Sequence, residues 1–216
     1  MKDSEFLEIL ERSKMIGQGA NGYVFKMEIK SMVLTVKLVM KSKLCSEKKL
    51  YKVYNTLSKE CKRYVPKPID IGIEYVKYRM RNRGIIAYKY IEGVPFREYI
   101  KNEENHKHIP RVMKNIRKGL LCLWYSGFIH GDMHLDNVMI LPDKSIKIID
   151  FSTCKSVKKL NKDEIIGEWF KKQWKAYYDS SEYNPNLALY DWKAMDSPGI
   201  WKHEKNIIQK RMASVK

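Results

Sequence analysis

Four polar residues stand in two short segments of the second half of the chain, and their types suit phosphoryl transfer. The segment FIHGDMHLDNVMI carries His130, Asp132 and Asn137 in the spacing HxDxxxxN, and Asp150 follows in IKIIDFS. Phosphoryl transfer needs a carboxylate that orients and deprotonates an acceptor hydroxyl, together with oxygen ligands for magnesium. We assign the first role to Asp132, in a loop between a helix and a strand. We expect Asn137 and Asp150, on the two arms of one hairpin, to converge on the metal.

A glycine-rich segment near the N-terminus suits a loop that binds phosphates. GQGANGYV contains Gly17, Gly19 and Gly22, and the absence of side chains there lets backbone N–H groups approach phosphate oxygens. A strand-like segment, YVFKMEI, follows this loop, whereas a dinucleotide site needs a helix at that point. The pattern therefore favours a hairpin that covers ATP.

Lys37 lies in the middle of the apolar run VLTVKLV. A buried ammonium group is costly unless it is paired or reaches a ligand phosphate. Glu47, at the start of the next amphipathic segment, can supply the paired acid. Lys41 and Glu60 are the competing candidates, but Glu60 lies close to the helix-breaking Pro66, so we prefer Glu47.

The first half of the chain must position these groups with strands and one helix. Residues 15–40 are rich in Val, Ile, Met and Phe between turn residues, which predicts an antiparallel meander of about three strands. Residues 46–57 have helical periodicity, and VPKP at 65–68 is expected to break that helix. Two further strand candidates are 69–76 and 84–91.

The second half is predicted to be mostly helical. Residues 109–128 have helical periodicity with Gly127 as a stop signal, and 137–151 read as a hairpin that turns at Pro142 and Asp143. A helical, aromatic segment is expected from residue 161. Strands and one helix followed mainly by helices predict an α+β fold.

In this order, over about residues 15 to 155, the segments resemble the protein-kinase-like superfamily. The resemblance implies a two-lobed fold, with residues 1–90 as a small antiparallel-sheet lobe and 91–216 as a reduced, mostly helical lobe. It implies that ATP and Mg²⁺, with Mn²⁺ as an alternative ion, are the cofactors. The glycine loop and Val24 would cover ATP, while the Lys37–Glu47 pair holds its phosphates.

The same resemblance extends to the connection between the lobes. YKYIEGVPFREYI is similar to the hinge of these enzymes. The backbones of Lys89 and Ile91 would then face adenine, and Tyr88 would take the gatekeeper position.

Differences from the usual protein-kinase motifs indicate which members of the superfamily this chain resembles. HGD replaces HRD, DFS with Ser152 replaces DFG, and His134 stands near the transferred phosphate where a lysine is usual. The arginine that senses activation-loop phosphorylation is Gly131 here, and only 66 residues follow Asp150. The chain is therefore similar to small atypical kinases: the RIO family, the KEOPS-complex kinase and compact kinases of large DNA viruses. It also resembles the aminoglycoside and choline phosphotransferases, which share HGD and IDF-type motifs.

The acceptor is expected to be a serine or threonine of a protein, since no helical insertion builds a small-molecule pocket. The net charge of +17 agrees with an acidic or nucleic-acid-associated partner, but we prefer to explain it by the lysine-rich composition of the chain. The alternatives are a small-molecule kinase, an ATP-binding ATPase switch that acts as an assembly partner, and a basic nucleic-acid-binding module without catalysis.

The cysteines and the termini indicate a chain kept in a reducing compartment, the cytoplasm or the cytoplasm of a host cell. Cys45, Cys61, Cys122 and Cys154 have no metal-ligand spacing, and we expect them to be core residues without a disulfide framework. The N-terminus lacks the features of a signal peptide, and no apolar run is long enough to span a bilayer.

Overall fold

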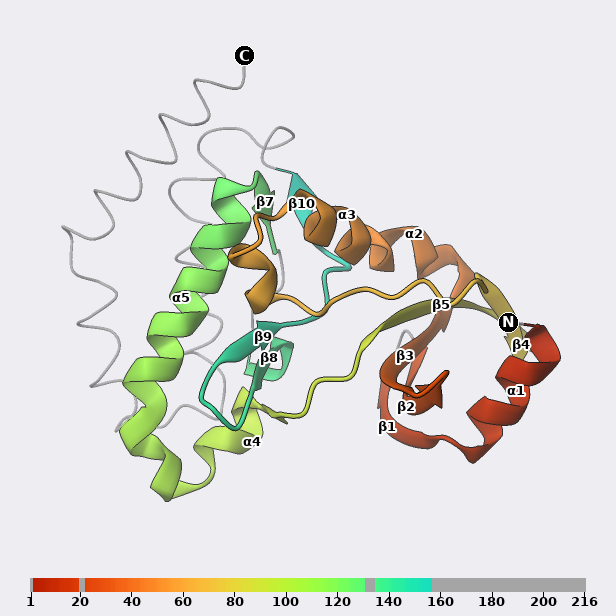
Figure 1. The fold of residues 1–216 in the computed structure, drawn as a ribbon, viewed down its shortest axis with the longest axis horizontal. Coiled ribbons are helices and arrows are strands. Elements are labelled where there is room, and N and C mark those ends of the chain that lie inside the picture. The colour runs from red at the N-terminus through yellow and green to blue at the C-terminus, as the bar shows by residue number, and fades with distance from the viewer. Residues whose placement is uncertain (1, 20–21, 131–134, 157–216) are drawn as a thin grey trace, which may run out of the picture.

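The computed structural model describes residues 2–19, 22–130 and 135–156 (Figure 1). Five antiparallel strands form its main sheet in the order β1-β2-β3-β5-β4. Their bounds are β1 Lys14–Gly19, β2 Gly22–Ile29, β3 Met32–Met40, β4 Tyr75–Tyr78 and β5 Arg81–Lys89. The predicted three-stranded meander is confirmed: buried residues alternate along the second half of β2, β3 is apolar along most of its length, and short turns join the strands. The helical segment expected from residue 161 lies outside the described residues.

Helix α1, Asp3–Arg12, covers one face of this sheet. Phe6 and Leu10 are fully buried, and they pack in one core cluster with alternate residues of the strands. That cluster contains Val36 and Leu38 but not the residue between them, since successive side chains of a strand point to opposite faces. Lys37 is therefore directed to the other face, away from α1.

The predicted helix over residues 46–57 forms, with two differences. It is divided into α2, Leu44–Glu47, and α3, Lys49–Thr56, with Lys48 between them. The expectation that VPKP at 65–68 ends it is wrong, because α3 already ends at Thr56 and the 3₁₀ turn η2, Cys61–Tyr64, intervenes.

The first of the two additional strand candidates is largely wrong. Within residues 69–76 only Tyr75 and Val76 belong to a strand, β4. The preceding stretch runs beside β5 without forming a ladder, held by a hydrogen bond from the Ile69 N–H to the Ala87 carbonyl at 2.9 Å. Its three isoleucines pack against the core as irregular chain, which sequence alternation alone does not distinguish from a strand.

The second half contains the predicted long helix and hairpin. They are α5, Ile109–Tyr125, and the strands β8, Val138–Ile140, and β9, Ile146–Ile148. The shorter elements are β6 Val94–Pro95, α4 Phe96–Ile100, η3 Glu103–His108, β7 Phe128–Ile129, η4 Leu135–Asn137 and β10 Lys155–Ser156. In Figure 1 the sheet with α1 and the helix α5 lie at opposite ends of the molecule, and β8 and β9 lie between them. The predicted α+β arrangement is confirmed.

A second core cluster joins α3 to the second half of the chain. Leu50, Val53 and Leu57 pack in the same cluster as apolar residues of α5 and of the β8–β9 hairpin. The helix that follows β3 is therefore fixed against the part of the chain that carries Asn137 and Asp150.

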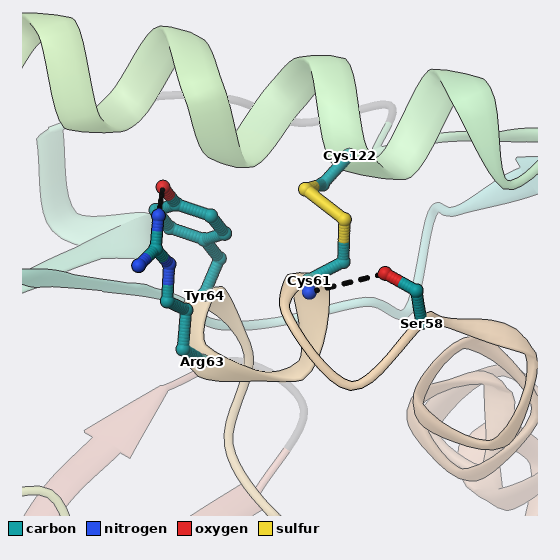
Figure 2. Close-up of a disulfide and its surroundings, with 5 residues drawn as sticks. All are labelled: Ser58, Cys61, Arg63, Tyr64 and Cys122. Carbon is teal, nitrogen blue, oxygen red and sulfur yellow. Dashed lines mark hydrogen bonds between the residues drawn. A yellow bond between two sulfur atoms is a disulfide. The ribbon is translucent and has the colours of Figure 1, made fainter.

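The cysteine prediction is wrong for three of the four residues. Cys61 of η2 and Cys122 of α5 form a disulfide, with their Cα atoms 5.4 Å apart (Figure 2). A separation of 61 residues leaves no local signal for this pairing, which arises because η2 packs on α5. Cys154 is a buried core thiol as expected, and burial raises its pKa to about 12, whereas Cys45 is free and exposed. Among the described helices, none is long and apolar enough to cross a membrane.

Candidate active site

Lys37 forms the centre of a charged cluster on the inner face of the sheet. Its Nζ lies 2.7 Å from Oε1 and 2.8 Å from Oε2 of Glu47, which is only 5% exposed. The predicted pair is present because α2 begins four residues after β3 and turns its last residue back over the strand. Lys41 and Glu60, the competing candidates, are both exposed.

The same ammonium group also reaches the second segment of the predicted site. Lys37 Nζ lies 3.3 Å from Oδ2 of Asp150, and the backbone N–H of Ser152 donates to Oδ1 of Asp150 at 3.3 Å. Asp150 has a φ of 61°, a left-handed conformation that aspartate tolerates better than most residues. One cation therefore joins β3, α2 and the segment after β9.

The two carboxylates that share Lys37 differ in their electrostatics. Burial raises the pKa of Glu47, and attraction to Lys37 offsets this effect only in part. Burial acts in the same direction on Asp150, but Lys37 and the Ser152 hydrogen bonds outweigh it and lower the pKa of Asp150. Asp150 is thus held ionised, as a metal ligand requires.

Asn137 and Asp150 flank the β8–β9 hairpin: Asn137 directly precedes β8, and Asp150 follows the end of β9 by two residues. Asn137 is buried, and its main-chain carbonyl oxygen accepts a hydrogen bond from the backbone N–H of Ile149 at 2.9 Å. Both residues line a cavity of about 170 Å³ together with Lys37 and Glu47. The remaining lining residues are Val24, Leu50, Pro66, Ile86, Tyr88, Ile149 and Phe151. An amide oxygen and a carboxylate oxygen on one cavity are a donor set that suits Mg²⁺.

His130 ties the start of the predicted catalytic loop to the same hairpin. It is buried, its Nε2 lies 2.8 Å from the Ile149 carbonyl oxygen, and its ring meets Phe151 edge-on at 5.0 Å. The Thr153 hydroxyl donates to the carbonyl of His130 at 3.0 Å. Asp132 and His134 themselves lie outside the described residues, so their side chains are not placed.

The glycines of the predicted phosphate loop have unequal roles. A Cβ on Gly22 would stand 1.9 Å from the carbonyl oxygen of Leu38, so this position requires glycine for contact with β3. A Cβ on Gly19 would meet nothing within 4 Å, and one on Gly17 would make ordinary contacts with Val24. Close packing of β2 on β3 is therefore one reason for glycine at position 22, and it acts in addition to the role predicted for the loop.

The hinge residues occupy the end of β5 and the segment after it. Tyr88 lines the cavity, and Ile91 is buried. The backbone N–H of Lys89 donates to the Lys67 carbonyl at 2.9 Å. A contact between Lys89 and adenine would therefore have to use the carbonyl group of this residue.

Two contacts near the site were not predicted from the sequence. Arg97 of α4 contacts Asp136 with its Nε, at 2.7 Å from Oδ1 and 2.9 Å from Oδ2. The ammonium of Lys49, at the start of α3, donates to the Ser152 carbonyl at 2.9 Å. Both contacts join residues far apart in the chain, and charge alone does not select these partners from a sequence with 42 Lys and Arg residues.

Comparison with known proteins gives one family. A model of the protein kinase domain matches residues 10–184. Serine/threonine-protein kinase RIO2 of Saccharomyces cerevisiae is 30% identical over 140 residues, which are 59% of this chain and 28% of that protein. Serine/threonine-protein kinase STE20 of Debaryomyces hansenii is 29% identical over 85 residues, 39% of this chain and 8% of that protein. The probable serine/threonine-protein kinase mkcB of Dictyostelium discoideum is 29% identical over 86 residues, 39% of this chain and 12% of that protein.

Proposed function

Because this chain belongs to the protein kinase domain family, whose model matches residues 10–184, we propose that it transfers the γ-phosphoryl group of ATP to a serine or threonine of a protein. The chain spans 28% or less of the curated relatives named above, so this activity is inferred from its own site. The observation that carries the proposal is the position of Lys37, within hydrogen-bonding reach of both Glu47 and Asp150 on one cavity.

Each group has a role in the proposed reaction. Lys37, oriented by Glu47, would hold the phosphates of ATP, and Gly17, Gly19, Gly22 and Val24 would cover them. Asn137 and Asp150 would hold magnesium, which when bound neutralises charge on the phosphoryl oxygens. Asp132 would accept the hydroxyl proton, and His134 would stand near the transferred group. Positioning and charge account for most of the acceleration, because phosphoryl transfer has a loose transition state.

The compact form of the enzyme supports an acceptor that is a protein. Within residues 90–130 the elements follow one another closely, and no inserted helix separates α4 from α5 beyond the short η3. Small-molecule phosphotransferases generally use such insertions to enclose their substrate. We therefore propose an atypical, minimal protein kinase, with residues 1–90 and 91–216 as its two lobes.

A transfer assay with ATP labelled in the γ-phosphate tests the proposal. The chain is incubated with a mixed protein substrate, with aminoglycosides or choline, and alone, and the label is followed into protein, small molecule or free phosphate. We expect label in protein, and a loss of roughly 100-fold or more for Asp132→Asn and Asp150→Asn. Asn keeps the shape of either side chain and tolerates the left-handed φ at position 150.

Asp70→Asn is the matched control, since Asp70 is an exposed aspartate in a turn on the opposite side of β5 from β3. Label found only in a small molecule would replace the proposed acceptor. Full activity of Asp150→Asn at saturating magnesium would contradict the metal assignment.

A further inference from the structure

The short helices α2 and α3 contact the candidate site at two points. Glu47, the last residue of α2, pairs with Lys37 of β3. Lys49, the first residue of α3, reaches the segment after β9, where its Nζ donates a hydrogen bond to the main-chain carbonyl of Ser152 at 2.9 Å. Two residues of consecutive helical turns thus hold the two parts of the chain whose charged groups meet at the cavity.

Ser152 is hydrogen-bonded through both of its main-chain polar groups. Its N–H donates to Oδ1 of Asp150 at 3.3 Å, and its carbonyl accepts from Lys49. These two groups belong to successive peptide planes, which change direction relative to each other only by rotation at residue 152. A contact that fixes the carbonyl of Ser152 therefore also limits where its N–H, and with it the Asp150 carboxylate, can point.

The turn after β9 has unequal backbone requirements at its two polar residues. Asp150 has a φ of 61°, a left-handed conformation that is costly unless the surroundings hold it. Ser152 is not among the described residues with a positive φ, so a serine fits at the position where the usual motif has glycine. A serine backbone is also less free than that of glycine. The carbonyl of Ser152 is thus a defined point on which an ammonium group can act.

The residues around Ser152 are fixed independently of Lys49. Phe151 and Cys154 are buried in the core cluster that also contains residues of α3. The side chain of Asp150, in contrast, is 35% exposed. Loss of the Lys49 contact is therefore expected to loosen the carboxylate of Asp150 without unfolding the segment around it.

The ammonium of Lys49 has a main-chain partner and no acidic one. Within residues 2–19, 22–130 and 135–156, the ion pairs involve other cations, and no carboxylate pairs with Lys49. Its side chain is half-buried, whereas Lys52, further along α3, is exposed. A hydrogen bond from a charged donor is stronger than one between neutral groups. Lys49 therefore differs from an ordinary surface lysine in having one defined partner, the Ser152 carbonyl.

We propose that Lys49 is a positioning residue for the proposed metal ligand Asp150, and that it acts through the main chain of Ser152. This role rests on the proposed transfer reaction and deepens it, because binding of magnesium then depends on a residue that does not line the cavity. A displacement of α2 and α3 would disturb the Lys37–Glu47 pair and the Asp150 carboxylate together. These helices thereby couple binding of the phosphates to binding of the metal.

A titration with Mn²⁺ tests this role without catalysis. The electron paramagnetic resonance signal of free Mn²⁺ is followed at a fixed concentration of a non-hydrolysable ATP analogue, with the same titration without protein as background. Lys49→Met keeps the apolar stem and removes the donor, Lys49→Arg keeps a charged donor, and Lys52→Met is the matched control on the same helix.

We expect Lys49→Met to weaken Mn²⁺ binding about tenfold, as is usual when a group that supports a metal ligand is lost. Lys49→Arg should keep most of the affinity, because its guanidinium can donate to the same carbonyl. Lys52→Met should bind Mn²⁺ like the wild type, since its side chain is exposed.

The magnesium dependence of phosphoryl transfer is the second readout. If the Asp150 carboxylate is in the competent position for only a fraction of the time, the apparent dissociation constant of the metal rises in inverse proportion to that fraction. We therefore expect the magnesium concentration for half-maximal activity to rise about tenfold in Lys49→Met, with transfer recovered at saturating magnesium. Activity that is lost equally at every magnesium concentration would indicate a general structural defect and overturn the positioning role.

The Mn²⁺ titration has two outcomes that contradict the role of Lys49. Equal losses of affinity in Lys49→Met and Lys52→Met would reduce the effect to net charge. A Lys49→Met variant with the metal affinity of the wild type would show that Asp150 is positioned without this contact.

The two readouts together separate this role from the proposed function. Weaker Mn²⁺ binding by Lys49→Met, in a chain that transfers no label to any acceptor, would support the positioning role and refute the transfer reaction. Label transfer by the wild type, with unchanged metal affinity in Lys49→Met, would refute only the positioning role. A wild type that binds no Mn²⁺ beyond the background would refute both.

Discussion

Arg97 and Asp136 link α4 to the short helix η4, through an Arg97 Nε that contacts both carboxylate oxygens of Asp136 at 2.7 and 2.9 Å. Asp136 directly precedes Asn137, which lines the candidate site. The contact therefore fixes the segment that carries a proposed metal ligand, although neither residue of the pair lines the cavity itself. Both side chains are partly exposed, so the contribution of the pair to stability is small.

Arg97→Ala should impair catalysis more than binding of ATP. A partly exposed pair contributes about 0.5–1 kcal/mol, which corresponds to a two- to fivefold lower kcat. The magnesium concentration at half-maximal activity should rise, because Asn137 is held less firmly, while the KM for ATP changes little. Lys101→Ala is the control, since it breaks an exposed pair of the same helix region with Glu98. An unchanged magnesium requirement in Arg97→Ala would leave Arg97 with a purely structural role.

Lys37→Ala should reduce kcat/KM by roughly 100-fold or more, as expected for loss of a buried cation that contacts phosphates. Lys41→Ala should have little effect, although strand alternation alone would direct both residues to the same face. Lys41 lies past the end of β3 in a 3₁₀ turn, and its ammonium faces Tyr75. Steady-state kinetics with ATP as the varied substrate decide between them, and a larger defect in Lys41→Ala would refute the proposed role of Lys37.

Glu47 and Asp150 should affect stability with opposite dependence on pH. Burial raises the pKa of Glu47 above its ordinary value of 4.5, so its contribution is complete below that pH and is lost as pH rises through the raised pKa. The pKa of Asp150 is lowered below 3.8, so its contribution is present above that pH and is lost as pH falls through the lowered pKa.

Glu47→Gln tests the first of these effects by urea unfolding between pH 4 and pH 7, a range that begins just below the ordinary pKa of 4.5 and extends above it. The free energy of unfolding of the variant, minus that of the wild type, should increase with pH, because only the wild type loses the contribution of Glu47. Glu60→Gln is the control, because it makes the same replacement at an exposed position. A difference for Glu47→Gln that decreases with pH would show that Lys37 outweighs burial.

Reduction of the Cys61–Cys122 disulfide should lower the free energy of unfolding by about 2–4 kcal/mol, because the bond closes a long loop in the unfolded chain. Urea unfolding with and without dithiothreitol measures this difference. A Cys61→Ser/Cys122→Ser variant should show no effect of the reductant, whereas Cys45→Ser, which removes a free exposed thiol, should behave like the wild type. A wild type that does not respond to dithiothreitol, with both thiols titrating as free, would contradict the disulfide.

Features that depend on neighbours along the chain can be predicted from the local sequence. The meander β1–β3, the helix α5 and the β8–β9 hairpin follow from local periodicity and turn residues. The Lys37–Glu47 pair was predictable because only ten residues separate its members. The proximity of Asn137 and Asp150 was predictable because the two residues flank one hairpin.

Contacts between distant segments of the chain arise from tertiary packing, and the local sequence does not predict them. Arg97 and Asp136 are 39 residues apart, and Cys61 and Cys122 are 61 apart. Charge and residue type do not specify such partners, because many equivalent side chains compete for each contact. The Tyr23 ring meets Arg83 only because β2 and β5 belong to one curved sheet with β3 between them. Long-range packing of this kind is set by the burial of whole faces, which no short segment of sequence records.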